Sequence, residues 1–98
     1  MKQSPYDYLS EGRQHFEKGE YNSAIQFYNQ FLDRAPQSDS ESRYNALTSL
    51  ALCYEVTHKL EKAEEALTLA ASLQPDEKAR KTTTRRLERI VSMKPKEE

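Results

Sequence analysis

Residues 18–37 of this chain read KGEYNSAIQFYNQFLDRAPQ, and residues 59–76 repeat much of that pattern as KLEKAEEALTLAASLQPD. The prolines of the two stretches, Pro36 and Pro75, lie 39 residues apart. Five more pairs at this offset keep their size class or hydrophobicity: Gly12 with Ala51, Ala24 with Ala63, Tyr28 with Leu67, Tyr8 with Leu47, and Tyr21 with Leu60. Matched pairs of this number at one offset exceed what chance would give, so the chain contains an internal repeat.

Within each copy the apolar residues follow the period of an α-helix. They are Ala24, Ile25, Tyr28, Phe31 and Leu32 in the first copy, and Ala63, Ala66, Leu67, Ala70 and Leu73 in the second. A shorter stripe precedes each set: Tyr8, Gly12 and His15 in the first copy, and Leu47, Ala51 and Tyr54 in the second. Each copy is therefore predicted to be a pair of helices.

Capping residues and a helix breaker place the helix ends. Ser4 with Asp7, and Ser38 with Glu41, have the spacing of capping boxes at helix starts. Gly19 separates the first helix from the second. We predict helices over residues 5–18, 22–34, 40–57, 60–73 and 77–92, with residues 93–98 as a frayed tail.

The composition favours a single all-α domain. A chain of 98 residues can bury one core but not two, and its two glycines and four prolines are too few for a many-stranded sheet. The single cysteine, Cys53, excludes an internal disulfide and fits a reducing compartment. The sequence has no apolar run of about 18 residues and no apolar signal core. We therefore expect a cytoplasmic protein without a membrane segment.

The repeated pattern resembles the tetratricopeptide repeat, W-x₂-L-G-x₂-Y…A-x₃-F…P. The matching residues are Tyr8, Gly12, Ala24, Tyr28 and Pro36 in the first copy, and Leu47, Leu50, Ala51, Tyr54, Ala63, Leu67 and Pro75 in the second. The resemblance implies antiparallel helical hairpins stacked as a short right-handed superhelix. We expect one domain over residues 1–98, with one repeat at 5–36, a second at 40–75 and a capping helix at 77–92.

The chain also departs from that pattern. Glu11 and His15 stand where the first repeat should have Leu and Tyr, and Phe31 stands where a small residue is usual. The five extra residues of the longer period lie between Pro36 and Tyr44. They could form either helix or loop.

The residue types that support catalysis or metal binding are not combined here at useful spacings. Cys53 lies inside an apolar helix and is predicted to be a core thiol. His15 and His58 lack the companions of a metal site. Glu11 and His15 are four residues apart, which favours a surface contact over an acid–base pair. We predict no catalytic, cofactor-binding or metal-binding residue, and no enzyme activity.

The resemblance implies that the first helix of each hairpin lines the inner surface of a curved stack. We predict a partner-binding groove from side chains on these helices that point away from the hairpin partner. These are Tyr6, Leu9, Arg13 and Phe16 on the first helix, Asn45, Thr48, Leu52 and Glu55 on the third, and Ala79, Thr82, Arg86 and Arg89 on the fifth. The alternative is that Leu9 and Phe16 pack between helices while the arginines are solvated.

Such a groove predicts a protein or peptide partner with an apolar anchor and an acidic group. The partner would be held by a non-catalytic adaptor or assembly module. Chaperone-binding members of the family clamp a C-terminal carboxylate with Lys and Asn, whereas the corresponding positions here hold Leu9, Arg13, Ser49, Ala79 and Thr83. We therefore do not expect a clamp of that type.

Two alternatives remain open. Residues 76–98 carry eight basic and five acidic side chains, net +3, so the last helix could bind nucleic acid or an acidic protein surface. Its basic residues are Lys78, Arg80, Lys81, Arg85, Arg86 and Arg89. No aromatic residue lies among them to stack on bases, and a solvated cap would look the same. Exposed apolar residues such as Tyr6, Phe27 or Met93 could instead support a weak homodimer rather than a monomer.

Overall fold

The computed structural model describes residues 4–73 and 76–94. It contains five helices in this part of the chain: α1 (Pro5–Glu17), α2 (Tyr21–Arg34), α3 (Ser40–Val56), α4 (Leu60–Ser72) and α5 (Glu77–Met93). The prediction of an all-α fold is confirmed, and each predicted helix end agrees with the structure to within one residue. Pro75, the repeat counterpart of Pro36, and residues 95–98 of the predicted tail lie outside the described residues.

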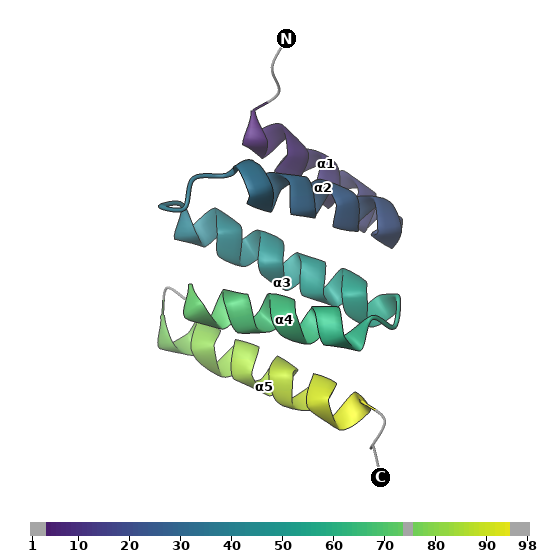
Figure 1. The fold of residues 1–98 in the computed structure, drawn as a ribbon, viewed down its shortest axis with the longest axis vertical. Helices are drawn as coiled ribbons and strands as arrows, with labels where there is room; N and C mark the ends of the chain where they lie inside the picture. Colours follow the sequence, from purple (N-terminus) through teal and green to yellow (C-terminus); the bar gives the residue numbers. More distant parts are fainter. Residues whose placement is uncertain (1–3, 74–75, 95–98) are drawn as a thin grey trace.

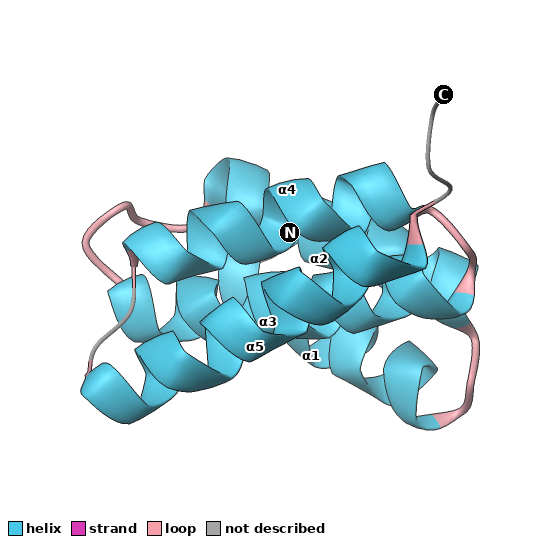
Figure 2. Ribbon diagram, turned by 90° about the horizontal axis from the view of Figure 1, so that it is seen from below, coloured by secondary structure: helices cyan, strands magenta, loops and turns pink. Residues whose placement is uncertain are grey.

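The helices follow one another along the long axis of an elongated molecule (Figure 1). Each helix packs against the next one in the chain, from α1 on α2 to α4 on α5. Seen along the stack, α1, α3 and α5 form one layer, and α2 and α4 form the other (Figure 2). The arrangement is that of helical hairpins followed by one further helix.

The core repeats with the sequence. Ala24 and Tyr28 on α2 are buried, and so are their counterparts Ala63 and Leu67 on α4. Ile90 is fully buried and closes the core from α5. Because a hairpin covers only one side of each of its helices, the second hairpin and α5 are needed to bury the remaining apolar stripe.

Two side-chain caps fix the starts of α1 and α3. Ser4 accepts a hydrogen bond from the backbone N–H of Tyr6, and Asp7 accepts one from the N–H of Ser4, as the predicted capping box requires. The cap of α3 is Asp39, which accepts from the N–H of Ser42 at 3.1 Å. The prediction of Ser38 as this cap was wrong by one residue, because the Asp39 carboxylate is the group that reaches the free N–H.

The extra residues of the 39-residue period form both loop and helix. Helix α3 has 17 residues and α1 has 13. The additional turn of α3 is residues 40–43, which precede Tyr44, the counterpart of Pro5 at the repeat offset. The rest of the insertion lies in the loop between Arg34 and Ser40.

The turns inside the two hairpins share a left-handed residue. Gly19 has φ +77°, and His58, at the same position of the second copy, has φ +61°. Glycine takes this conformation without steric cost, whereas a Cβ makes it unfavourable by about 1–2 kcal/mol. The second hairpin therefore uses the same turn with a less suitable residue.

We expect His58→Gly to raise the free energy of unfolding by about 0.5–1 kcal/mol, measured by urea denaturation followed by circular dichroism. The matched variant is Gly19→Ala, where an added Cβ would have no atom within 4 Å, so that only the backbone conformation is tested. It should lower stability by a similar amount. If His58→Gly lowered stability instead, the His58 side chain would stabilise the fold by more than its left-handed backbone conformation destabilises it.

The first hairpin depends on a close approach at Gly12. A Cβ at this position would lie 2.9 Å from Cδ1 of Tyr28, inside the contact distance of carbon atoms. Gly12 and Tyr28 are both buried, so the ring has little room to move away. The second copy carries Ala51 and Leu67 at these positions, a larger small residue with a smaller partner.

We expect Gly12→Ala to lower the free energy of unfolding by about 1–3 kcal/mol, because overpacking outweighs the roughly 1 kcal/mol gained in helix propensity. Combining it with Tyr28→Leu reproduces the pair of the second copy. The double variant should be more stable than the sum of the single effects predicts, by at least about 0.5 kcal/mol in a double-mutant cycle. Strict additivity would mean that the two positions do not limit each other.

Candidate partner-binding face

The predicted groove residues all lie in the layer of α1, α3 and α5, whose solvent-facing side we call the α1–α3–α5 face (Figure 2). Arg13, Asn45 and Thr82, one on each of these helices, are exposed. Thr48 is half-buried and its hydroxyl donates to the carbonyl of Asn45 at 3.0 Å. The predicted face residues thus come from three separate segments of the chain whose helices lie in one layer.

The apolar part of this face is centred on α3. Leu52 is 37% exposed, and Val56, one turn later, is 46% exposed. Leu9 and Phe16 on α1 are half-buried and pack against the core, and Phe16 meets Tyr21 edge to face. Much of the surface of Leu9 and Phe16 is therefore covered by neighbouring helices, as the alternative to a groove role requires. Val56 was missed from the sequence, although its spacing of four from Leu52 puts it on the same helix face.

Among the predicted groove residues, Arg86 and Arg89 each form an ion pair with Glu55. The Glu55 carboxylate, whose side chain is 8% exposed, accepts from Nη2 of Arg89 at 2.7 Å and from Nη2 of Arg86 at 3.4 Å. The same Arg86 nitrogen donates to the backbone carbonyl of Thr48 at 3.2 Å. These bonds fasten α5 to α3. They also neutralise part of the positive charge that the sequence assigned to the groove.

Arg86 and Arg89 differ in how much of the side chain is accessible to a partner. The side chain of Arg86 is 20% exposed, whereas that of Arg89 is 57% exposed. Arg13, across the face on α1, is exposed and lies near enough to Tyr28 to oppose the rise in the pKa of that phenol caused by burial. The accessible cations of the face are therefore Arg13 and the outer side of Arg89.

Tyr6 is engaged at the edge of this face. Its hydroxyl donates to Oδ2 of Asp39, and its ring packs against Phe31. This hydrogen bond, with that from the Ser42 N–H, lowers the pKa of Asp39, and the same bond raises the pKa of Tyr6. The stabilising effect of ionised Asp39 is present above the usual carboxyl pKa and is lost as the pH falls through the lowered value. Tyr6 thus connects α1 to the start of α3.

Cys53 and His15, which were considered as reactive residues, are each held by packing or polar contacts within the fold. Cys53 is buried, and burial raises the pKa of its thiol to about 11, so it stays protonated at neutral pH. His15 stacks on Phe27 and its Nδ1 lies 2.6 Å from Glu20, closer than the 3.9 Å between Nε2 and Glu11. Among residues 4–73 and 76–94, no three His, Cys, Asp or Glu side chains are grouped as metal ligands.

Comparison with known proteins agrees with the repeat architecture. A family model described as tetratricopeptide repeat matches residues 8–38, which cover most of α1 and all of α2. The second hairpin repeats the buried positions of the first at the constant sequence offset.

The chain is a tetratricopeptide-like helical repeat protein. Searches of curated proteins and of solved structures gave no match. Tetratricopeptide repeats generally act as non-enzymatic modules for protein–protein interaction. Within the described part of this tetratricopeptide-like chain, no helix combines the length and hydropathy needed to cross a bilayer.

We expect Glu55→Gln to lower the free energy of unfolding by about 1–3 kcal/mol, because it leaves two arginines without their shared counter-ion. The matched variant is Glu64→Gln, which removes the half-buried ion pair of Glu64 with Lys94 that also joins α4 to the end of α5 and is more accessible to water than Glu55. That change should cost less than about 1 kcal/mol. Thermal and urea unfolding of both variants measure the difference, and equal losses would contradict an anchoring role for Glu55.

Proposed function

We propose that this tetratricopeptide-like protein is a non-catalytic interaction module that holds a peptide segment of a protein partner on its α1–α3–α5 face. The observation that carries the proposal is the exposed apolar pair Leu52 and Val56 on α3, with Arg13 on α1 and Arg89 on α5 to either side. Exposed apolar side chains bordered by charge are a common form of protein-binding surface.

The same surface indicates the chemistry of the partner. An apolar side chain would cover Leu52 and Val56, and a carboxylate would meet Arg13 or the outer side of Arg89. Thr83, at a position of the chaperone-type clamp, is 1% exposed and bonded to Tyr44, so it offers nothing to such a ligand. We infer a partner that presents an internal acidic and apolar segment, and we place this interaction in the cytoplasm.

The test compares two faces of the same protein. Leu52→Glu and Arg13→Glu change the α1–α3–α5 face, whereas Leu69→Glu and Lys62→Glu make the matched changes on α4, in the other layer. Proteins captured from a lysate by the wild-type chain identify a partner, whose dissociation constant is then measured for each variant by titration. We expect the first two variants to bind at least about tenfold more weakly and the other two to bind like the wild type.

Circular dichroism and urea unfolding must show that all four variants are folded. Arg86→Glu is unsuitable as a test, because it would break the Glu55 ion pair and destabilise α5. Loss of binding in the α4 variants alone would place the partner on the other layer and overturn the proposal.

A second candidate function rests on the exposed charge of α5. Lys78, Arg80, Lys81 and Arg85 are exposed on the last helix of the stack, whereas Arg86 and Arg89 are bonded to Glu55. A nucleic acid or an acidic protein surface would use the four exposed cations. Binding that falls steeply with salt and is lost in Arg80→Glu with Arg85→Glu, but not in Leu52→Glu, would favour this function.

A further inference from the structure

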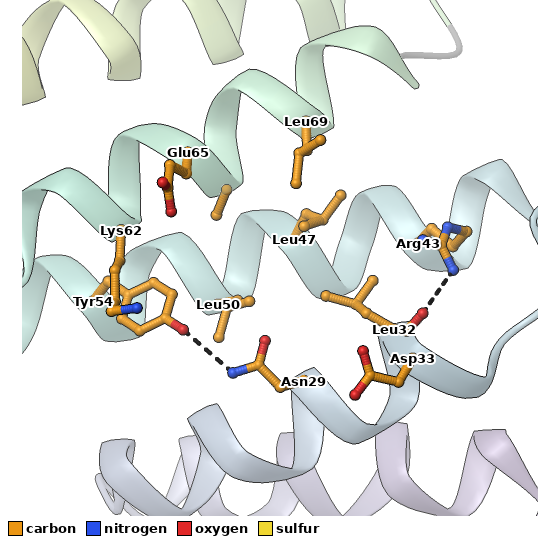
Figure 3. A pocket seen from close by; sticks show the side chains of 11 residues that line it. Asn29, Leu32, Asp33, Arg43, Leu47, Leu50, Tyr54, Lys62, Glu65 and Leu69 are labelled. Atoms are coloured by element: carbon orange, nitrogen blue, oxygen red, sulfur yellow. Dashed lines mark hydrogen bonds between the residues drawn. The ribbon is translucent and has the colours of Figure 1, made fainter.

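A groove separates α2 from α4 on the side of the molecule away from the α1–α3–α5 face, with α3 as its floor (Figure 3). It contains a cavity of about 410 Å³ and an adjoining one of about 230 Å³. The two share Leu32, Arg43, Leu47 and Leu69, so they are parts of one groove. The larger cavity alone lies within the usual size of small-molecule sites.

The two ends of the groove differ in character. The floor runs along α3 from Arg43 through Leu47 and Leu50 to Tyr54, about 16 Å at the rise of an α-helix. At the Tyr54 end the tyrosine hydroxyl accepts a hydrogen bond from Asn29, and the charged side chains of Lys62 and Glu65 lie nearby (Figure 3). At the Arg43 end four leucines line the groove together with the arginine and two uncharged polar residues, Gln37 and Ser72.

The smaller cavity at that end combines one cation with four leucines. It is lined by Leu32, Gln37, Arg43, Leu47, Leu69, Ser72 and Leu73, among which Arg43 is the only ionisable residue. At about 30 Å³ for each water-sized group, its volume holds roughly eight non-hydrogen atoms. The complementary ligand is therefore small, largely apolar and singly negative.

Arg43 is held in position but not neutralised. Its Nη1 donates to the carbonyls of Leu32 at 3.0 Å and Ala35 at 3.4 Å, which closes the C-terminal end of α2. Its Nε is buried and has no hydrogen-bond partner among the described residues. Within that part of the chain no carboxylate forms an ion pair with it, although Asp33 lines the larger cavity nearby. A partly buried guanidinium without a counter-ion favours binding of an anion.

The cation of the smaller cavity comes from the extra residues of the longer repeat period. Arg43 is the last residue of the extra turn, residues 40–43, that lengthens α3 relative to α1. Without this turn α3 would start at Tyr44, and no cation would stand over the end of α2. Among the described residues that line the smaller cavity, the insertion thus supplies the charged one.

We propose that the cavity of Arg43 and the four leucines binds an apolar carboxylate, with its hydrocarbon chain among the leucines and its carboxylate on the guanidinium. A free short-chain acid and the last residue of a peptide share this chemistry. In the second case the peptide would continue into the larger cavity. This site is separate from the α1–α3–α5 face, so the two proposals stand or fall independently.

The test is a titration of the isotope-labelled chain by nuclear magnetic resonance, with 4-methylpentanoate as the probe and 4-methylpentanamide as its neutral control. We expect saturable shifts of the Arg43, Leu69 and Leu73 amides with a dissociation constant on the order of 10 mM or tighter, and about tenfold weaker binding of the amide. Acetyl-Ala-Ala-Leu with a free carboxyl end forms the second arm. Tighter binding than the free acid would assign the site to peptide ends, and weaker binding would assign it to small acids.

Two variants separate the site from general stability. Arg43→Gln should abolish binding, but it also removes the bonds to the end of α2 and can unfold that end. Leu69→Glu avoids this difficulty, because Leu69 is 56% exposed and the new carboxylate would repel the ligand at the rim. It should weaken binding of 4-methylpentanoate about tenfold, whereas Thr68→Glu, one residue away and outside the groove, should leave it unchanged.

Equal binding of acid and amide would overturn the proposal, as would unchanged binding by Leu69→Glu. The absence of saturable shifts at these amides up to about 100 mM probe would also overturn it, since even a weak site would be occupied at that concentration.

Discussion

The structure depends on how closely the two helices of a hairpin can cross. At the crossing of α1 and α2, Gly12 leaves only enough room for the ring of Tyr28. A helix pair that approaches so closely buries its shared apolar side and leaves the opposite sides uncovered. The second hairpin meets this requirement with Ala51 and Leu67, both fully buried or nearly so. Stacking of α3 on α2 then follows, because neither hairpin has another way to cover its remaining apolar residues.

Helix α5 is attached to the stack by polar bonds as well as by apolar burial. Only Thr83 and Ile90 are buried on this helix, so apolar burial alone gives it a small share of the core. Polar bonds complete the contact with α3, through Tyr44 to Thr83 and through Glu55 to Arg86 and Arg89. Because the ion pairs lie on the proposed partner-binding face, the same arginines both hold the stack together and shape its charge. A partner would therefore meet fewer free cations than the sequence alone suggests.

The two layers of the molecule offer different surfaces to other molecules. The α1–α3–α5 face presents exposed leucine and valine between cations, which suits a peptide segment lying across the helices. The groove between α2 and α4 is concave, and its floor residues Leu47 and Leu50 are buried. Such a cavity suits a small group rather than a broad protein surface. The extra turn of α3, which has no counterpart in α1, adds Arg43 to this groove.

The sequence by itself determined the five helices, their ends to within one residue, and the repeat that pairs Gly12 with Ala51. These features depend on helical periodicity and on short-range capping, which neighbouring residues specify. Helical spacing also groups residues on one side of each helix, and the prediction of a partner-binding face rests on it. The tertiary structure alone decided that Glu55 binds Arg86 and Arg89, 31 and 34 residues away, and that Arg43 stands among leucines from three helices. Contacts of this kind depend on the distances between helices, which packing sets and no local pattern encodes.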